Sequence, residues 1–450
     1  MNAIIKNINI VNEGRIVNGD VIIRNQRIES IGTSLSPEKM QNYREINGEG
    51  LYLLPGIIDD QVHFREPGLI HKGTIASESR AAVAGGITSY MEMPNTIPNT
   101  LSQDLLEQKY AIAARQSMAN YSFFMGINKT NLEEVLKTDT ESVCGISDDG
   151  LYFQGEDGIL ANHPEFLEKL FSRSETLIAL HSEDETIIKN NETYYKSLFG
   201  DNIPFQYHPL IRSEASCVQA TTRIMDIAAK FNTRLHILHV STLKEALLFD
   251  SKIPLVQKRI TAEACIHHLF FSDKDYKKLG SKLKWNPAVK TESDRKGLLQ
   301  ALLDGHLDII ASDHAPHTIL EKAGNYFSAL SGGPLVQHAL PAMLELFHKG
   351  EITLDKIAEK MAHNVAEIYK IKNRGYIREG YFADLVIVNL NTASLVTAKS
   401  LYYKCGWSPF EGFKFQGAVE STFVNGVVAF DRGLFNASTA GQRLQFSKFR

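Results

Sequence analysis

The chain has 450 residues, of which 43% are hydrophobic and 22% charged, and its formal net charge is −4 at pH 7. This composition is typical of a globular protein with ample material for a core. The charge excludes a general basic field that would recruit nucleic acid or an anionic membrane. The length allows two or three average domains, or one barrel of about 250 residues with an additional domain.

The cysteines and the apolar runs narrow the class further. The four cysteines are far apart and form no CxxC pair, which argues against a disulfide framework or a thiolate zinc site and fits a reducing cytosol. We find no secretory signal at the N-terminus, and no apolar run approaches the roughly 18 residues of a membrane span. We therefore expect a cytoplasmic protein with no membrane or nucleic-acid partner.

Short strands are predicted at both ends of the chain. In the first 54 residues, the segment 3–11 is rich in β-branched residues. Near the other end, residues 384–389 read as a strand, and Asn425-Gly426 is a strong hairpin signal. Because an isolated hairpin is marginal in water, we expect residues 1–54 and 376–450 to complete each other as one small β-sandwich.

Between these ends, strand-like and helix-like segments alternate. Such βα repeats predict a parallel sheet that is buried on both faces. Periodicity alone does not exclude a doubly wound sheet. Polar residues at the ends of the strands favour a (β/α)₈ barrel instead, and we expect this barrel to span residues 55–375. The strand patterns lie at 87–93, 176–180, 234–240 and 308–312, and helix patterns lie at 105–118, 217–230 and 294–303.

The most informative segment runs from Leu54 to Gly68. An apolar run enters it through Pro55-Gly56, and polar residues then follow at alternate positions. Such positions share one face of an extended strand, so Gln61, His63 and Arg65 would present an amide, an imidazole and a guanidinium to one cavity. The simpler interpretation is an ordinary buried strand with a polar end, and further clusters along the chain argue against it.

Imidazoles and carboxylates follow several other strand patterns. A lone histidine beside a strand is more often an ordinary polar residue than a ligand, and Asp-Asp-Gly by itself is more often a turn. Their joint occurrence, each directly after a β-run, predicts a metal site at the mouth of the barrel, with zinc the leading candidate. The candidate ligands are Gln61, His63, Asp149, His181, His239 and Asp313.

The segment from Leu54 to Gly68 resembles the dihydroorotase family of the amidohydrolase superfamily, whose signature is Pro-Gly-x-Ile-Asp-x-His-Val-His-x-Arg-Glu-Pro-Gly. The one departure is Gln61, which replaces the first metal-binding histidine. The resemblance spans nearly the whole chain and implies a (β/α)₈ barrel with a small β-sandwich. It also implies a zinc-dependent, reversible cyclisation of N-carbamoyl-L-aspartate to L-dihydroorotate, the third step of pyrimidine biosynthesis.

The resemblance assigns roles to the other metal candidates. His181 in Leu-His-Ser-Glu and His239 in His-Ile-Leu-His-Val-Ser-Thr match metal histidines of the family. Asp313 in Ala-Ser-Asp-His-Ala-Pro-His matches the metal-bound catalytic aspartate, which would accept a proton from water and return it to the departing amide nitrogen. Asp149 in Ser-Asp-Asp-Gly matches the carboxylate of a branch that lacks a carboxylated lysine, and its neighbour Asp148 is expected to face away.

Gln61 decides whether the chain holds one or two zinc ions. A neutral amide is a poorer zinc ligand than an imidazole. We therefore expect the site that includes Gln61 to be labile, altered or empty, and the other site to hold its metal firmly. The firm set is His181, His239 and Asp149, and the weak set is Gln61, His63 and Asp313.

The same resemblance implies which residues bind the substrate. Arg65 offers a fork to the substrate carboxylate, against the simpler interpretation of a salt bridge with Glu66. His63 belongs to this group as well as to the metal ligands. Backbone contacts would come from Ser331 and Gly332, although Ser-Gly-Gly-Pro departs from the commoner Pro-Phe-Gly. The other candidates are Asn95, Asn286 and His317.

Some neighbouring features are expected to lie outside the chemistry. Strand geometry allows only one of His236 and His239 to face the lumen, so we interpret His236 as outward-facing or structural. The pair His267-His268 is likewise interpreted as structural. Residues 190–212 are expected to form a long polar excursion that covers the site.

Two other functions stay open. One is a related cyclic amidohydrolase of the allantoinase or hydantoinase kind, against which Arg65 argues. The other is a non-catalytic dihydroorotase-like subunit of a pyrimidine-pathway assembly, for instance with an aspartate transcarbamoylase, because Gln61 is a lost ligand. The presence of the other motif residues favours the enzyme. A homodimer is the default expectation for the oligomer.

Overall fold

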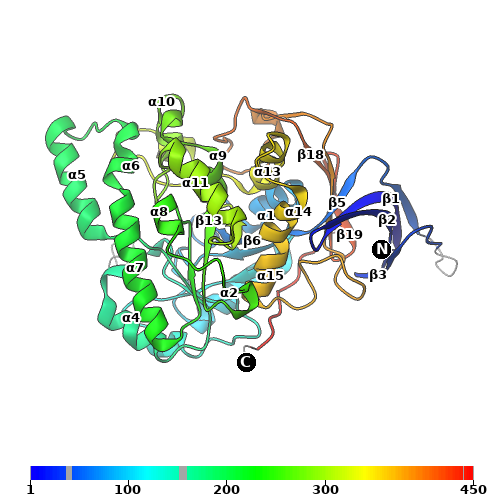
Figure 1. Cartoon of the computed structure of the whole chain (residues 1–450), viewed down its shortest axis with the longest axis horizontal. Helices are drawn as coiled ribbons and strands as arrows, with labels where there is room; N and C mark the ends of the chain where they lie inside the picture. The colour runs from blue at the N-terminus through cyan, green and yellow to red at the C-terminus, as the bar shows by residue number, and fades with distance from the viewer. Residues whose placement is uncertain (1, 37–42, 152–159, 439, 449–450) are drawn as a thin grey trace.

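A closed barrel of parallel strands forms the larger part of the computed structural model, which describes residues 2–36, 43–151, 160–438 and 440–448 (Figure 1). Within these residues the parallel strands pair in the order of a (β/α)₈ barrel, which confirms the expected fold class. A bridge between Val62 and His314 closes the ring. The strands are β6 (Ile57–Val62), β7 (Ile87–Glu92), β8 (Asn120–Phe123) continued by β9 (Met125–Gly126), β10 (Ile146–Ser147), β11 (Ile178–Leu180), β12 (Leu235–Ile237), β13 (Ile260–Cys265) and β14 (Ile309–Ala311).

Helices surround the barrel strands and bury them on their outer side. The start of α11 shows why the chain turns helical where it does: Thr291 Oγ1 accepts a hydrogen bond from Asp294 N at 3.1 Å, and the Asp294 carboxylate caps Thr291 N in return. The longer outer helices are α1 (Ile75–Ala84), α2 (Gln103–Gln116), α4 (Pro164–Phe171), α7 (Glu214–Phe231), α11 (Glu292–Leu303) and α13 (Ala339–His348).

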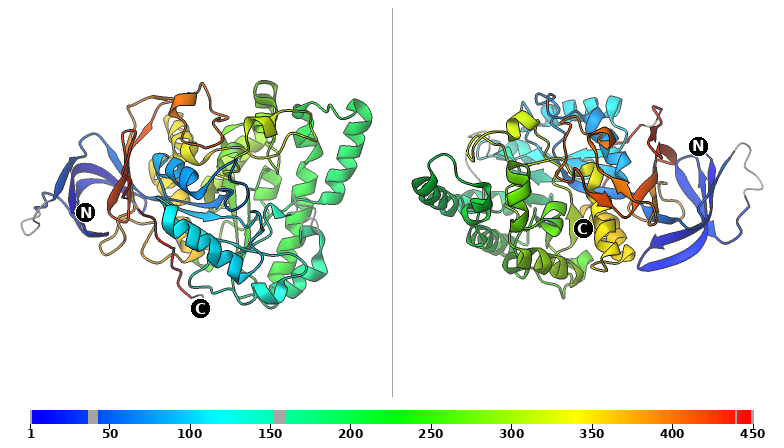
Figure 2. Two further views of the ribbon diagram at one scale, coloured as in Figure 1. Left: turned by 180° about the vertical axis from the view of Figure 1, so that it is seen from behind. Right: turned by 90° about the horizontal axis from the view of Figure 1, so that it is seen from above.

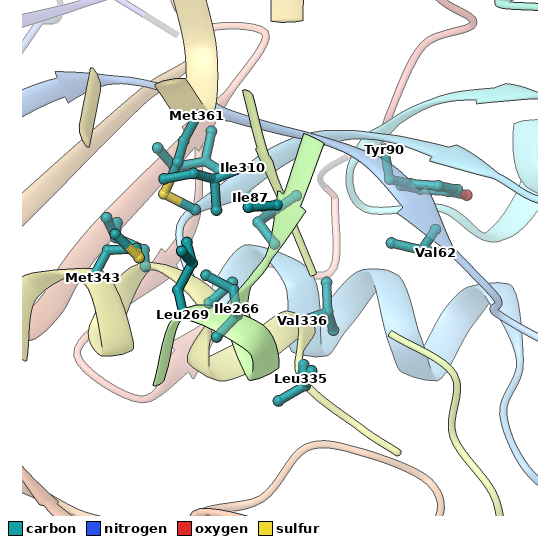
Figure 3. Close-up of a cluster of buried hydrophobic side chains, with 14 of the residues drawn as sticks. Val62, Ile87, Tyr90, Ile266, Leu269, Ile310, Leu335, Val336, Met343 and Met361 are labelled. Carbon is teal, nitrogen blue, oxygen red and sulfur yellow. The ribbon is translucent and has the colours of Figure 1, made fainter. Parts of the chain in front are cut away.

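One large hydrophobic cluster lies between the strands and these helices. Figure 3 shows part of it, where Ile87 and Ile310 come from strands β7 and β14, and Met343 comes from α13. Each of these side chains is at most 1% exposed, and burial of an Ile or Met contributes roughly 1.5–3 kcal/mol. This packing makes the barrel a rigid frame for the ends of its strands.

The two ends of the chain share a second, nine-stranded sheet. Strand β5 is its centre, because it pairs in parallel with β1 and antiparallel with β15. Figure 2 shows this sheet at one end of the barrel. The proposed domain limits at residues 54/55 and 375/376 remain a prediction. The strands are β1 (Ala3–Asn12), β2 (Arg15–Arg24), β3 (Arg27–Gly32), β4 (Arg44–Asn47), β5 (Tyr52–Pro55), β15 (Leu385–Asn389), β18 (Ala418–Val424), β19 (Val427–Asp431) and β20 (Leu434–Phe435).

Gly56 joins this sheet to the barrel between β5 and β6. A Cβ at this position would lie 2.2 Å from Thr88 Oγ1, so only glycine lets the two segments approach this closely. The backbone N of Gly56 donates to Asp384 O at 2.8 Å. The chain therefore enters the barrel directly from the shared sheet.

Residues 190–212 differ from the polar excursion that we expected. Most of this segment is helical, in α5 (Glu185–Phe199) and α6 (His208–Ile211), and α5 stands at the end of the molecule opposite the nine-stranded sheet (Figures 1 and 2). The Asp184 carboxylate caps α5 by accepting from Thr186 N at 3.0 Å. Apolar residues, among them Ile203 and Ile211, pack together beneath it, which explains the ordered structure. Among the described residues, no helix combines the length and hydrophobicity that crossing a membrane requires.

Candidate metal centre and active-site pocket

A cavity of about 400 Å³ opens where the barrel strands end. Every residue that the sequence predicted to bind substrate lines it, together with Asp149 and Asp313. The other candidate ligands, Gln61, His181 and His239, are buried and contact Asp149. The predicted substrate-binding set at the cavity is His63, Arg65, Asn95, Asn286, His317, Ser331 and Gly332.

Asp149, His181 and His239 form a compact group of possible metal ligands. His181 Nδ1 lies 3.1 Å from His239 Nε2, and Asp149 Oδ1 lies 3.8 and 3.7 Å from these two nitrogens. Donors of a tetrahedral zinc ion lie roughly 3.4 Å apart, given metal–ligand distances of about 2.0–2.2 Å. The spacing therefore fits one metal ion held by the set that we expected to be firm.

The tautomer of His181 is fixed by its outer partner. Nε2 lies 2.9 Å from Glu183 Oε2, which can only accept, so Nε2 carries the hydrogen and the lone pair of Nδ1 faces His239 and Asp149. Glu183 in turn pairs with Arg212 at the end of α6. A carboxylate behind a ligating histidine is the usual way in which proteins orient such a ring.

Asp148 holds the same histidine through the backbone. Its Oδ1 accepts from His181 N at 3.1 Å, and its Oδ2 accepts from Leu160 N at 3.3 Å. It therefore points away from the metal ligands. The two adjacent aspartates therefore have different roles. Asp149 faces His181 and His239, whereas Asp148 holds the backbone that carries His181.

His63 connects the metal group to Asp313. Its Nδ1 donates to Asn95 Oδ1 at 2.7 Å, so Nε2 faces two carboxylates, Asp149 Oδ2 at 3.2 Å and Asp313 Oδ1 at 3.4 Å. Burial opposes its protonation, but hydrogen bonds to both aspartates raise the pKa of His63 to about 9. The fold therefore brings the side chains of Asn95 and Asp313 into contact with His63.

The electrostatics of the two aspartates differ. Burial opposes ionisation of Asp149, yet hydrogen bonds from His239 and His63 outweigh it and hold the pKa of Asp149 well below its usual range. Burial raises the pKa of Asp313, and His63 offsets this only in part. Asp149 is thus suited to remain an anion, whereas Asp313 is the better proton acceptor of the two.

Gln61 lies beside the candidate metal ligands, but its amide forms hydrogen bonds with neighbouring side chains. Its Nε2 donates to Asp149 Oδ2 at 3.2 Å, and its Oε1 accepts from the Cys265 thiol at 3.4 Å. The reverse orientation of the amide would set an oxygen against the carboxylate, so the network itself assigns the two atoms. The Gln61 amide is therefore engaged by Asp149 and Cys265 and does not present its oxygen to a metal ion beside Asp149.

Arg65 is held at the edge of the cavity by groups other than Glu66. Its Nε donates to Pro316 O at 3.1 Å, and its backbone N donates to Glu92 Oε1 at 3.2 Å. Glu66 instead accepts from Ile75 N at the start of α1, at 2.9 Å. The simple salt bridge with Glu66 is therefore absent among the contacts of the described residues, and the guanidinium lines the cavity.

Three site residues have backbones in the left-handed region, which residues other than glycine seldom adopt. They are Arg65 (φ 73°), His239 (φ 40°) and Asp313 (φ 47°). Each such conformation costs on the order of 1–3 kcal/mol and persists only where the surroundings impose it. Their common location supports a functional role for this cavity.

Lys72 is a cavity residue that the motifs did not single out. Its Nζ lies 3.2 Å from His317 Nδ1 and 3.0 Å from Glu321 Oε1. The ammonium can only donate, so His317 accepts at Nδ1, and its Nε2 lies 2.9 Å from Ser331 O and 3.3 Å from Arg65 Nη2. The sequence signal was a lysine in the turn directly after Arg65, which by itself reads as an ordinary surface residue.

The histidines that we interpreted as structural are all buried. His267 stacks on Trp285, with ring centres 4.9 Å apart, and its Nε2 lies 3.9 Å from Asp313 Oδ2. His268 Nε2 lies 3.1 Å from Pro287 O. His236 is separate from the metal group and contacts Asp60 and Glu263 inside the barrel, so the expectation that only one of His236 and His239 faces the lumen was wrong.

Comparison with known proteins agrees with this geometry. Residues 52–429 match the sequence model of the Amidohydrolase family. The chain is 31% identical to a dihydroorotase of Halobacterium salinarum, over 90% of this chain and 91% of that protein. It is also 31% identical to an allantoinase of Solibacter usitatus, over 97% and 95% of the two chains. These matches confirm the resemblance inferred from the motifs.

A solved structure confirms the fold. The L-hydantoinase (dihydropyrimidinase) from Arthrobacter aurescens superposes with a TM-score of 0.90 at 24% sequence identity, over 98% of this chain and 99% of that one. At this identity the similarity concerns the fold alone.

Proposed function

We propose, from the membership of this chain in the amidohydrolase family, that it is a dihydroorotase, a metal-dependent hydrolase that opens and closes the cyclic amide of dihydroorotate. The observation that carries the proposal is the grouping of Asp149 with His181 and His239 behind a cavity that Asp149, Asp313 and Arg65 line, with His63 in contact with both aspartates. A drifted scaffold would be expected to lose several of these groups, and here the geometry of all of them is consistent with one reaction.

The metal proposed is a single zinc ion on Asp149, His181 and His239. Two imidazoles and a carboxylate suit zinc, and their spacing supports the assignment. When bound, zinc acidifies a water molecule and polarises the scissile carbonyl. The engaged amide of Gln61 supports a count of one ion at this centre rather than two.

Asp313 is the proposed general base and acid. In the hydrolytic direction its carboxylate accepts a proton from the attacking water as the new C–O bond forms. It then returns the proton to the amide nitrogen as the C–N bond breaks, and the same steps reversed close the ring. His63, 3.4 Å away, holds the Asp313 carboxylate in place.

The substrate carboxylate is proposed to bind at Arg65, whose guanidinium offers paired charge-assisted hydrogen bonds. His317, held by Lys72 and Ser331 O, would lie beside that carboxylate. Asn95 and Asn286 are proposed to bind the polar edge of the ring, and Ser331 and Gly332 to supply backbone contacts. Gly332 needs its φ of 114°, and a Cβ there would lie 2.7 Å from Ala315 O.

The test is an assay of the isolated, zinc-replete chain with dihydroorotate, followed in both directions. The proposal expects turnover at a zinc content of at least one ion per chain, with little activity toward allantoin or hydantoin, because those rings lack the carboxylate that Arg65 would bind. Turnover of allantoin instead would favour the related cyclic amidohydrolase. Inactivity that only a partner such as aspartate transcarbamoylase restores would favour the non-catalytic subunit.

The cellular setting belongs to the same proposal. We expect a cytoplasmic homodimer that contributes to pyrimidine synthesis and needs no other chain for activity. Light scattering on the purified chain tests the dimer directly.

A further inference from the structure

A second buried group of possible metal ligands lies inside the barrel. Asp60 on β6, His236 on β12 and Glu263 on β13 bring one donor atom each to within 4.8 Å of the others. His236 Nε2 lies 3.2 Å from Glu263 Oε2 and 3.6 Å from Asp60 Oδ2. All three side chains are 0% exposed. None of them belongs to the group proposed for catalysis.

An irregularity in β6 makes this group possible. The pairing of β6 with β7 shifts register between Asp59 and Val62, which breaks the alternation of side chains along the strand. As a result, two consecutive residues both contact groups from across the barrel: Asp60 contacts His236, and Gln61 contacts Asp149 and Cys265. A regular strand would have sent one of these two side chains outward.

In this group two buried carboxyl groups face one imidazole. Among the described residues, no Lys or Arg nitrogen lies within 4.0 Å of either Asp60 or Glu263, and His236 is the ion-pair partner of each. Tyr369 donates to Asp60 Oδ2 at 2.8 Å, but Asp60 Oδ1, in a side chain without exposed surface, has no hydrogen-bond partner in the part of the chain that is described. Buried carboxylates are normally paired, protonated or bound to a metal.

We propose that Asp60, His236 and Glu263 bind a second divalent cation, zinc in the first instance, at a structural site separate from the catalytic centre. The two donor distances of 3.2 and 3.6 Å bracket the roughly 3.4 Å expected between ligands of a tetrahedral zinc ion. One imidazole and two carboxylates form a ligand set that zinc accepts. The cation neutralises the carboxylates and joins β6, β12 and β13.

This site also supports the catalytic centre through the backbone. Glu263 Oε1 accepts from His239 N at 3.0 Å, and His239 is one of the residues with a left-handed backbone. His236 is fixed from its other side, where Nδ1 lies 2.8 Å from Thr261 Oγ1. A cation that holds Glu263 therefore helps to hold His239 in position without contacting the substrate.

The experiment measures zinc in the full chain produced with added Zn²⁺, by elemental analysis and by anomalous scattering at the zinc edge. The expected result is two peaks, one bounded by Asp60, His236 and Glu263. Asp60→Asn, which keeps the shape but removes the anionic ligand, should lose this peak and lower the zinc content by one ion per chain. The matched control Glu245→Gln changes another buried carboxylate and should keep both peaks.

The outcomes separate this site from the proposed function. A single peak at Asp149, His181 and His239 in the wild-type chain overturns the proposal, because the carboxylates then share a proton instead of a metal. A peak only at Asp60, His236 and Glu263 supports the site and contradicts the proposed catalytic centre. If Asp60→Asn does not fold, His236→Gln replaces it, and the wild-type map alone decides the question.

Discussion

Gln61 Nε2 donates a hydrogen bond to Asp149 Oδ2 over 3.2 Å, and the thiol of Cys265 occupies the other end of the same amide. The neutral amide thus contacts Asp149 from the position at which the related motif has its first metal-binding histidine. This contact explains how the chain accommodates a glutamine at that position: the Asp149 carboxylate keeps a hydrogen-bond donor on that side.

Replacing Gln61 should therefore change the number of metal ions. Gln61→His would add an imidazole beside His63 and Asp313, and we expect a new anomalous peak bounded by these residues and one additional zinc ion per chain. Gln61→Leu removes the amide without adding a ligand and serves as the control, with no new peak. If Gln61→His gains no metal, the geometry of the strand, and not the ligand type, limits the site.

Asp313→Asn tests the proton transfer. An amide cannot accept the proton of the attacking water, and general-base catalysis contributes about 10²–10⁴-fold, so we expect kcat to fall by that factor. Asp313 lies outside the proposed zinc group, so the zinc content should stay at the wild-type value. A variant that loses both metal and activity would show instead that Asp313 acts mainly as a ligand.

Arg65→Ala tests the recognition of the substrate carboxylate. A hydrogen bond to a charged group is worth about 1.5–3 kcal/mol, so kcat/KM for dihydroorotate should fall roughly 10- to 150-fold, mainly through KM. Arg65→Lys keeps the charge but loses the paired geometry and should recover only part of this. An unchanged KM in both variants would exclude Arg65 as the carboxylate site. The backbone bond to Glu92 is unaffected in either variant.

The buried pair of Lys109 and Glu92 should be a strong determinant of stability. Lys109 Nζ lies 3.0 Å from Glu92 Oε2, the side chains are 1% and 0% exposed, and Glu92 also accepts from Arg65 N. Lys109→Met leaves the buried Glu92 carboxylate without this partner. We expect the free energy of unfolding, measured by urea titration, to fall by about 3–5 kcal/mol.

An exposed pair supplies the comparison for this measurement. Lys137 pairs with Glu134 at 2.7 Å, but its side chain is 66% exposed. Lys137→Met should leave the urea midpoint unchanged, because solvent screens such pairs. Equal effects of the two substitutions would contradict the role given to burial.

Glu245 predicts a specific pH dependence of stability. Burial raises its pKa from the ordinary 4.5 to about 7, although hydrogen bonds from Thr221 Oγ1 and Ser241 N offset part of the effect. The folded state therefore binds this proton more tightly than the unfolded state. The contribution to stability is fully present below about pH 4.5 and is lost as the pH rises through about 7.

Glu245→Gln should remove this dependence. The variant carries no titrating proton at this position, so its stability relative to wild type should improve by on the order of 3 kcal/mol between pH 4.5 and pH 7.5. Urea unfolding of both proteins across this range measures the difference. A difference that is constant with pH would show that Glu245 is already ionised in the folded chain.

Several contacts were predictable because they follow from local pattern. His63, His181 and Asp313 could be predicted as site residues because each follows a β-run directly, and parallel strands bring their carboxyl ends to one rim of the barrel. The sheet shared by the two ends was likewise expected, because neither set of strands can bury its apolar face alone. The helical nature of residues 190–212 was missed, because its tyrosines and charged residues read as polar although they cover an apolar cluster.

The sequence by itself determined the order of the strands and the residue types at their ends, because a period of two and a polar terminus are properties of each segment alone. Only the tertiary structure decided which atoms meet. The hydrogen bond between Lys72 and His317 joins residues 245 positions apart, and the orientation of the Gln61 amide depends on Cys265, which is 204 positions away. The approach of Asp60 to His236 depends on a register shift that no local pattern marks. Distances of this kind are set by the closure of the barrel, which sums contributions from every strand.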